Sequence, residues 1–268
     1  MQRWRDRVAV VTGASSGIGA AISLELVKHG LRVAGLARRV DKVQELADSL
    51  AGSPGKLHPI KCDISKEEDI LHAFSEVKEK LGGVDILVNN AGVVHETLLS
   101  DGSTDDWFNM FHVNVLGLSI CTREALKSMR ERSNGGGHVV HINSIAGHYD
   151  VSAPGFHMYS ATKHAVTALT EGLRKELVSQ HSNIRVTSIS PGLVDTELLR
   201  HGSNKTLNPE EIYTRIPCLK PSDIADAVLY VLGTPPHVQV QSSSVIILCD
   251  KWEKFAIETF CFCSVHRD

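Results

Sequence analysis

The stretch RVAVVTGASSGIGAAISLEL, residues 7–26, places a short apolar run before a glycine-rich turn and a segment with helical periodicity. Gly13, Gly17 and Gly19 fall where the chain must turn tightly and where its backbone can approach a ligand. The free amides at the start of the helix suit a pyrophosphate. A glycine-rich turn without a ligand is the alternative, but the position between a strand and a helix favours dinucleotide binding. The spacing is G-x-x-x-G-x-G rather than the more familiar G-x-G-x-x-G.

The alternation of strand and helix continues along the chain. Apolar runs of strand length are separated by longer helical segments, which is typical of βαβ units and a parallel sheet. VDILV and HVVHI are apolar without alternation, as expected for strands buried on both faces. The sequence therefore predicts an α/β fold: a Rossmann-like, doubly wound parallel sheet with helices on both faces, in a single domain. The predicted strands are RVAVVT (7–12), LRVAGLA (31–37), KLHPIKCD (56–63), VDILVNNAG (84–92), GGHVVHINS (136–144) and NIRVTSISPG (183–192), and long helices are predicted at about 104–132 and 155–180.

The composition argues against several classes of protein. There are 31 acidic and 28 basic residues, a net charge of -3, and no arginine or lysine cluster that would support binding to nucleic acid. No apolar stretch approaches the length of a membrane span, and the N-terminus lacks the apolar core of a signal peptide. Six cysteines show no C-x-x-C pair, and fourteen histidines show no metal-ligand spacing. We expect a cytoplasmic protein with reduced thiols, no metal, no membrane span and no nucleic-acid partner.

A tyrosine and a lysine lie one helical turn apart in MYSATKHAV, residues 158–166. At this spacing Tyr159 and Lys163 share one face of a helix, so an ammonium can sit beside a phenol. A phenol beside a cation ionises more readily. Taken alone, the pair is better explained by a packed tyrosine and a solvated lysine.

The end of the second predicted strand bears on the choice of cofactor. An acidic residue here would accept hydrogen bonds from the adenosine ribose. The sequence reads GLARR instead, so that Arg38 and Arg39 offer cations for a 2'-phosphate, and the first carboxylate is Asp41. For one of the two arginines, a solvated surface position without a ligand remains an alternative. The pair favours NADP (NADPH) over NAD.

A set of motifs follows in a fixed order along the chain: TGASSGIG (12–19), NNAG (89–92), Asn114 in HVNVLG, Ser144 in INSIAG, YSATK (159–163) and ISPGLVDTE (189–197). This set resembles the short-chain dehydrogenase/reductase family over about residues 5–240. Longer segments, such as RWRDRVAVVTGAS and CLKPSDIADAVLYVL, are similar to the group of dehydrogenase/reductase family member eleven and the insect farnesol dehydrogenase-like enzymes.

The resemblance implies catalytic roles for four residues. Tyr159 is expected to act as the general acid/base, although at a pKa of about 10 only roughly one phenol in a thousand is ionised at neutral pH. Lys163 is expected to lower that pKa and to hold the nicotinamide ribose. Ser144 is expected to hydrogen-bond the substrate oxygen, and Asn114 to keep a water in the proton path.

The resemblance also implies a set of cofactor contacts. Asp63 would contact the adenine, Asn90 and Gly92 would pass close to a ribose, and the segment after Pro191 would frame the nicotinamide amide. For Asp63 in DISKEED, capping of the next helix is an alternative role. The full expected set is Gly13, Ser15, Ser16, Gly17, Ile18, Gly19, Arg38, Arg39, Asp63, Ile64, Asn90, Gly92, Tyr159, Lys163, Pro191, Gly192, Val194 and Thr196.

The segments expected to contact the substrate are mostly apolar and carry no arginine pair for an anionic substrate. They comprise residues 145–158 and, after Pro191, Leu193, Leu198, Leu199, Ile212 and Tyr213. An apolar alcohol or ketone fits them best, and the resemblance implies prenyl alcohols such as farnesol or steroids with 3- or 17-position oxygens. His148 and His157 are interpreted as loop residues rather than as part of the site.

Two other functions remain as alternatives. One is an NADP-binding sensor without turnover, although a sensor has no need of a proton path. The other is a sugar-nucleotide epimerase or dehydratase, although the C-terminal half leaves little room for a sugar-binding lobe.

The C-terminal segment departs from the family pattern. Residues 1–240 are expected to form the NADP-binding domain, and residues 241–268 a divergent tail in which SVIILC (244–249) would supply a last strand. FAIETFCFC (255–263) has no counterpart in the family. We expect a homodimer or homotetramer, in which this tail would alter the interface.

Overall fold

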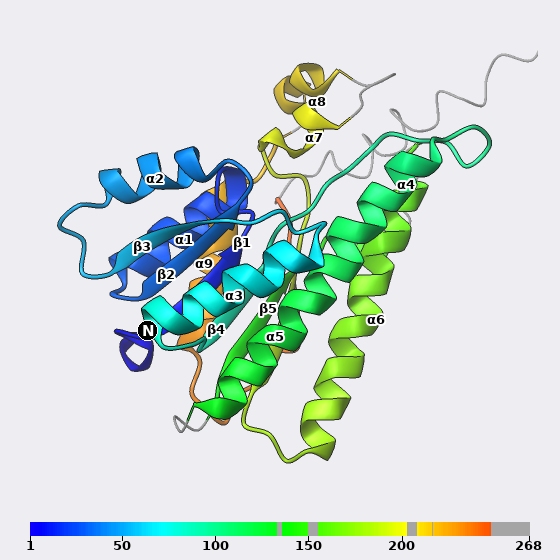
Figure 1. Cartoon of the computed structure of the whole chain (residues 1–268). Coiled ribbons are helices and arrows are strands. Elements are labelled where there is room, and N and C mark those ends of the chain that lie inside the picture. Colours follow the sequence, from blue (N-terminus) through cyan, green and yellow to red (C-terminus); the bar gives the residue numbers. More distant parts are fainter. Residues whose placement is uncertain (133–135, 150–154, 203–207, 216, 248–268) are drawn as a thin grey trace, which may run out of the picture.

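The computed structural model describes residues 1–132, 136–149, 155–202, 208–215 and 217–247. Its centre is a seven-stranded sheet in the order β3-β2-β1-β4-β5-β6-β7, and every neighbouring pair is parallel (Figure 1). The strand order reverses between β1 and β4, and at such a point the loops diverge and leave a crevice. The strands are β1 (Val8–Thr12), β2 (Arg32–Ala37), β3 (Lys56–Lys61), β4 (Ile86–Asn89), β5 (His138–Ile142), β6 (Arg185–Pro191) and β7 (Ser242–Val245).

Helices cover both faces of the sheet. On one face α1 packs beside α9, with α2 next to it, and on the other face lie α3, α5 and α6 (Figure 1). The long helices are α1 (Gly17–Lys28), α2 (Val40–Ser49), α3 (Glu67–Leu81), α5 (Leu118–Glu131), α6 (His157–Ser179) and α9 (Pro221–Gly233). Shorter elements are η1 (Gln2–Trp4), α4 (Thr104–Phe111), η2 (His112–Gly117), η3 (Ile145–Gly147), α7 (Glu197–His201) and α8 (Pro209–Arg215).

The central strands are buried on both faces, as their unbroken apolar pattern predicts. In β1, Ala9 and Val11 belong to the core beneath α1 and α9, whereas Val8 and Val10 belong to the core beneath α3 and α5. All four side chains are inaccessible to solvent. The doubly wound α/β fold predicted from the sequence is therefore confirmed.

The helix predicted at about 104–132 is one helical segment with an irregular centre. Residues His112–Gly117 form a π-helix between α4 and α5. Such a segment holds one extra residue per turn and often occurs at functional sites. It contains Asn114, whose side chain is buried.

The last strand begins slightly earlier than SVIILC suggests. β7 spans Ser242–Val245 and pairs with β6 from Ser188 to Pro191. Leu248 and the remainder of the tail, with Cys249, Cys261 and Cys263, lie outside the described residues. Within the described ranges, no helix is long and apolar enough to cross a membrane.

Candidate active site

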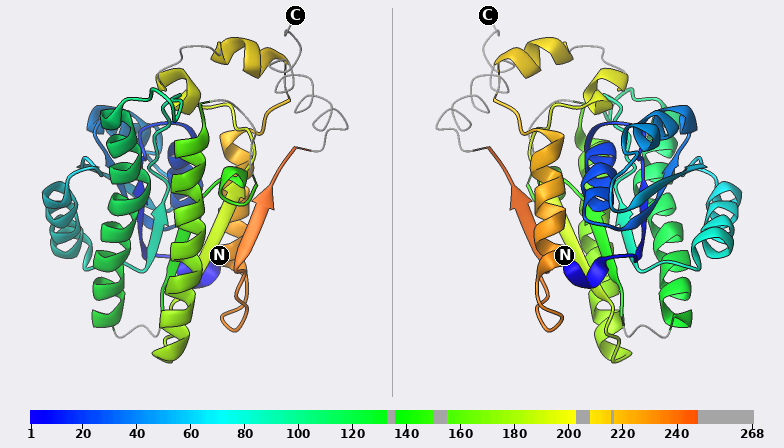
Figure 2. Two further views of the ribbon diagram at one scale, coloured as in Figure 1. Left: turned by 90° about the vertical axis from the view of Figure 1, so that its right-hand side faces the viewer. Right: turned by 90° about the vertical axis from the view of Figure 1, so that its left-hand side faces the viewer.

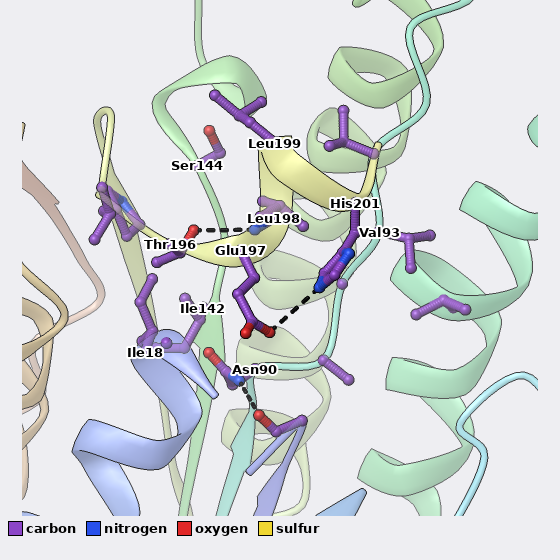
Figure 3. A pocket seen from close by; sticks show the side chains of 18 of the residues that line it. Ile18, Asn90, Val93, Ile142, Ser144, Thr196, Glu197, Leu198, Leu199 and His201 are labelled. Atoms are coloured by element: carbon purple, nitrogen blue, oxygen red, sulfur yellow. Dashed lines mark hydrogen bonds and ion pairs between the residues drawn. The ribbon is translucent and has the colours of Figure 1, made fainter. Parts of the chain in front are cut away.

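A cavity of about 860 Å³ opens at the carboxyl ends of the strands. The loops after β1, β2, β3, β4, β5 and β6 form its walls, and α7 and α8 lie over the same end of the sheet (Figure 2). We call these two short helices the lid. In Figure 3, Leu199 of the lid lies toward Ser144, and Glu197 points away from it toward Asn90.

The glycine-rich turn is fixed by contacts from β4. Gly13 and Gly17 adopt positive φ angles of 68° and 53°. The Asn90 side chain donates to the Thr12 carbonyl over 2.9 Å, and the Asn90 backbone N–H donates to the Thr12 hydroxyl over 3.0 Å. A Cβ atom on Gly19 would overlap the Gly13 carbonyl oxygen. The turn therefore needs glycine, and Thr12, which was not singled out from the sequence, holds the two strand ends together.

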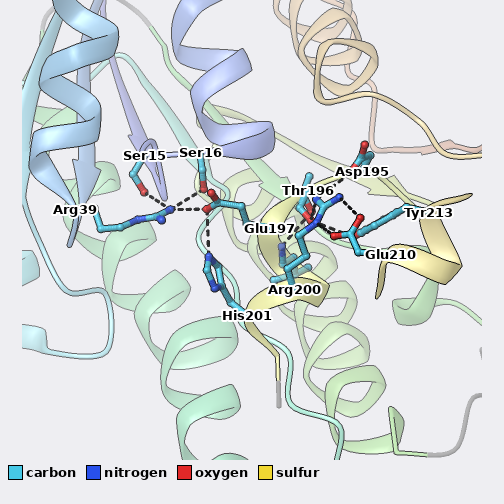
Figure 4. Close-up of polar contacts among 11 residues, drawn as sticks. Ser15, Ser16, Arg39, Asp195, Thr196, Glu197, Arg200, His201, Glu210 and Tyr213 are labelled. Atoms are coloured by element: carbon cyan, nitrogen blue, oxygen red, sulfur yellow. Dashed lines mark hydrogen bonds and ion pairs between the residues drawn. The ribbon is translucent and has the colours of Figure 1, made fainter. Parts of the chain in front are cut away.

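Arg39 reaches across the mouth of the cavity. Its Nη2 lies 2.7 Å from Oε2 of Glu197 and 3.0 Å from the Ser16 hydroxyl (Figure 4). Both side chains of the ion pair remain about half exposed, at 45% and 44%. The carboxylate nearest to Arg39 thus comes from the lid, 158 residues away in the chain. Glu197 was not predicted from the sequence, because no local pattern connects it with the arginines that follow β2.

Asp63 lies in the cavity wall after β3 and does not cap the next helix. Its Oδ1 accepts from the Ser65 amide at 3.0 Å and from the Ser65 hydroxyl at 2.8 Å. Helix α3 begins at Glu67 with Lys66 as its N-cap, so the capping role suggested for Asp63 is wrong. Burial alone would raise the pKa of Asp63, but these hydrogen bonds and the charge of Arg38 lower it. A carboxylate and a guanidinium therefore face the same region of the cavity.

Ser144, Tyr159 and Lys163 converge on the cavity from two elements. Ser144 lies two residues after the end of β5 and caps η3, where its hydroxyl accepts from the Ala146 amide at 3.1 Å. It also forms a hydrogen bond with Tyr159, in the first turn of α6. The Lys163 ammonium lies 5.7 Å from the Tyr159 ring centre and donates to the Ile142 carbonyl over 3.1 Å.

The pKa of Tyr159 is higher than the Tyr159–Lys163 spacing led us to expect. Burial raises this pKa to about 12, and the hydrogen bond with Ser144 only partly opposes the effect. Burial also lowers the pKa of Lys163 to about 8. The expectation that Lys163 lowers the phenol pKa is therefore not met by the protein groups alone. The physical reason is that desolvation disfavours both charged forms.

Asn114 lies behind the cavity wall. Its side chain accepts from the Val93 amide and donates to the Val93 carbonyl, both at 2.9 Å, and it donates to the Thr162 hydroxyl over 3.1 Å. Every polar atom of the side chain is thus engaged by protein groups. Asn114 fixes the loop after β4 against the helix that carries Tyr159 and Lys163.

The side of the cavity beyond Ser144 is apolar. His148 is not among its lining residues, and its Nε2 lies 2.8 Å from the Ser190 hydroxyl. His157 is exposed and is the first residue of α6, so its interpretation as a loop residue is wrong. Residues 150–154, within the expected substrate segment, lie outside the described residues. The apolar lining residues are Val93, Val94, Ile145, Ala146, Tyr149, Phe156, Leu193, Leu198, Leu199, Ile212 and Tyr213.

The structure brings almost all of the expected residues to one cavity. Every residue of the expected cofactor set lines it except Gly19, which supports the turn from behind. All five apolar residues expected after Pro191 line it as well. Within the described ranges, no group of three histidine, cysteine or acidic side chains is arranged to hold a metal ion.

Comparison with known protein families matches residues 7–206 to the family described as short chain dehydrogenase. Dehydrogenase/reductase SDR family member 11 from Mus musculus is 55% identical over 245 residues, which cover 90% of this chain and 94% of the mouse protein. Farnesol dehydrogenase from Aedes aegypti is 50% identical over 248 residues, covering 91% of this chain and 97% of the mosquito protein.

Solved structures show the same architecture. The closed form of serine dehydrogenase complexed with NADP+ has a TM-score of 0.80 and 32% identity, and the match covers 89% of this chain and 94% of that one. A short chain dehydrogenase from Burkholderia cenocepacia in complex with NADP has a TM-score of 0.79 and 27% identity, with 91% and 98% covered.

Proposed function

Because the chain belongs to the short-chain dehydrogenase family, we propose that this oxidoreductase uses NADP to interconvert an apolar alcohol and its carbonyl compound. The observation that carries the proposal is the convergence of Ser144, Tyr159 and Lys163 between a phosphate-binding turn and an apolar wall. These three side chains are the groups needed to exchange a proton with a substrate oxygen. The cavity extends past them on both sides, toward the cofactor turn and toward the lid.

Tyr159 would exchange the proton at its phenol oxygen. In carbonyl reduction the neutral phenol donates, and in alcohol oxidation the phenolate accepts. Its high pKa keeps the phenol protonated at neutral pH, which suits the reductive direction. Ser144, already hydrogen-bonded to this phenol, would hold the substrate oxygen within reach of the proton. The Lys163 ammonium, close to the Tyr159 ring, would donate a hydrogen bond to the nicotinamide ribose of the cofactor.

The residues around the glycine-rich turn fit a dinucleotide. Gly13 and Gly17 leave room for close approach, and the free amides at the start of α1 would bind a pyrophosphate. Arg38 and Arg39 would bind a 2'-phosphate, which is the basis for proposing NADP over NAD. When bound, the nicotinamide supplies or accepts the hydride. Structures similar to this chain were solved with NADP, in keeping with this choice.

The substrate would lie against the apolar wall and the lid. Leu198, Leu199, Ile212 and Tyr213 come from the lid, and Val93 from the loop after β4. These five side chains carry no cation that could hold an anionic substrate. The similarity to farnesol dehydrogenase over most of both chains favours a prenyl alcohol, and 3- or 17-ketosteroids are the second candidates.

The test is the absorbance of reduced nicotinamide with purified protein. NADP with farnesol and NADPH with a 17-ketosteroid are the two reactions to compare. Formation of NADPH in the first supports the prenyl-alcohol proposal, and loss of NADPH in the second keeps the chemistry but changes the substrate. No turnover in either assay, with cofactor binding shown by calorimetry, would favour a sensor over an enzyme.

A further inference from the structure

Glu197 places a carboxylate among the groups proposed to bind phosphate. Arg39 precedes α2, and Ser16 precedes α1. Each of the two side chains forms a hydrogen bond with this carboxylate, and Arg39 also donates to the Ser16 hydroxyl. His201, one turn further along α7, adds an Nε2 atom at 3.4 Å from the same carboxylate oxygen. The hydrogen bond from Arg39, followed by that from Ser16, holds the pKa of Glu197 below its usual value. The Glu197 side chain is therefore held in its charged form at the place where a phosphate group of the cofactor is proposed to bind.

The lid does not need Glu197 for its own cohesion. Arg200 joins the two lid helices, because it lies 2.7 Å from Glu210 of α8 and 3.0 Å from Asp195 before α7. Its guanidinium also lies 4.6 Å from the ring centre of Tyr213. In Figure 4 this cluster and the Arg39–Glu197 pair form two separate groups. Glu197 thus points out of the lid toward the cofactor turn.

Resting on the proposed use of NADP, we infer that Glu197 is a specificity-determining residue that competes with the 2'-phosphate of the cofactor for Arg39. One guanidinium nitrogen, Nη2, makes the contacts to Glu197, Ser16 and Ser15. A 2'-phosphate that binds the same nitrogen must displace the carboxylate, because two anions in contact repel each other. Displacement also detaches α7 from the glycine-rich turn. A cofactor without the 2'-phosphate does not compete for Arg39, so the carboxylate of Glu197 can stay in place.

The test is calorimetric binding of two nucleotides to the full-length protein. The first, 2',5'-ADP, carries the 2'-phosphate, and the second, 5'-AMP, does not. Glu197→Gln should bind 2',5'-ADP about two- to fivefold more tightly, the range expected for an exposed ion pair. The same variant should bind 5'-AMP within about twofold of the wild type. The matched control is Glu211→Gln on the exposed side of α8, which removes one negative charge from the lid without breaking the ion pairs of Arg200.

A third variant separates failure of this inference from failure of the NADP proposal. Arg39→Ala should weaken binding of 2',5'-ADP and abolish the gain from Glu197→Gln in the double variant. If Arg39→Ala weakens 2',5'-ADP but Glu197→Gln does not tighten it, the competition is wrong and the NADP proposal stands. The competition is also wrong if Glu211→Gln tightens 2',5'-ADP as much as Glu197→Gln does. If Arg39→Ala leaves 2',5'-ADP unchanged, the competition is wrong, and if Arg38→Ala combined with Arg39→Ala also leaves it unchanged, the NADP proposal is wrong as well.

Discussion

The base of the cavity and its lid are held in place by different forces. Lys163 is 6% exposed and Ile142, which accepts its hydrogen bond, is 5% exposed, and both belong to elements packed in the core. In the lid, Arg200 forms ion pairs with Glu210 and with Asp195, which precedes α7, and these side chains are 34–67% exposed. Packing fixes positions within fractions of an ångström, whereas an exposed ion pair contributes about 0–1 kcal/mol. The proposed proton transfer would thus take place in the tightly packed region, and the proposed enclosure of the substrate would depend on the weakly held one.

The largest effect is expected from the base of the cavity. Tyr159→Phe removes the proposed proton donor and should lower kcat by about 10²–10⁴-fold. Because the substitution keeps the ring, NADP should still bind with nearly the wild-type affinity. Steady-state kinetics and calorimetry check the two parts. Tyr230→Phe, on the exposed side of α9, is the control, and a Tyr159→Phe enzyme that keeps most of its rate would remove the acid/base role.

The buried ammonium of Lys163 should lower the free energy of unfolding of the wild-type protein, although it is proposed to take part in the reaction. Lys163→Met removes a desolvated charge, at the loss of one hydrogen bond, and should raise the free energy of unfolding at pH 7 by about 2 kcal/mol. Activity should fall at the same time. Urea denaturation measures the gain, and Lys175→Met, on the exposed side of the same helix, should change stability by less than about 0.5 kcal/mol.

The pH dependence of this gain has a definite sign. The pKa of Lys163 is about 8 in the folded protein and 10.5 in the unfolded chain. Between these values the unfolded chain holds more protons, so the wild-type protein becomes more stable as the pH rises. The advantage of Lys163→Met should therefore be complete below about pH 8 and shrink toward pH 10.5. An advantage that grows with pH would contradict the burial of a charged lysine.

An intermediate effect is expected at the boundary between the two regions. Arg38→Ala combined with Arg39→Ala should weaken NADP by about tenfold, the value of one charge-assisted contact, and NAD much less. Titration of each cofactor with the double variant gives the two ratios. Equal losses for NADP and NAD would remove the 2'-phosphate assignment.

The smallest effect is expected in the lid. Arg200→Met breaks both exposed ion pairs and should raise KM about two- to threefold while leaving kcat unchanged within error. The wild-type enzyme in high salt should show a similar change, because salt screens exposed charges. Arg130→Met, on α5, is the matched control. A large loss of kcat in Arg200→Met would show that the lid also positions the reacting groups.

The elements fixed by local pattern could be predicted from the sequence, and those fixed by distant contacts could not. The apolar strands, the glycine-rich turn and the Tyr159–Lys163 pair each depend on neighbours within a few residues. The Arg39–Glu197 contact joins residues 158 positions apart, and no spacing rule connects them. The raised pKa of Tyr159 depends on burial, which the motif does not specify. The π-helix at His112–Gly117 was hidden because its apolar pattern passes for a continuous α-helix.

That π-helix also restricts how this protein can change in length. In a regular α-helix each residue turns the chain by about 100° around the axis, so one extra residue would rotate everything beyond it by that angle. The wider turn of the π-helix takes up the extra residue, and the buried face of α5, which includes Cys121, Ala125 and Met129, stays in phase with the sheet. A one-residue deletion within His112–Gly117 would leave this face buried in a more regular helix, but it would shift Asn114 away from its contacts with the loop after β4 and with α6. We therefore expect natural variants of this segment to differ by substitution and not by length.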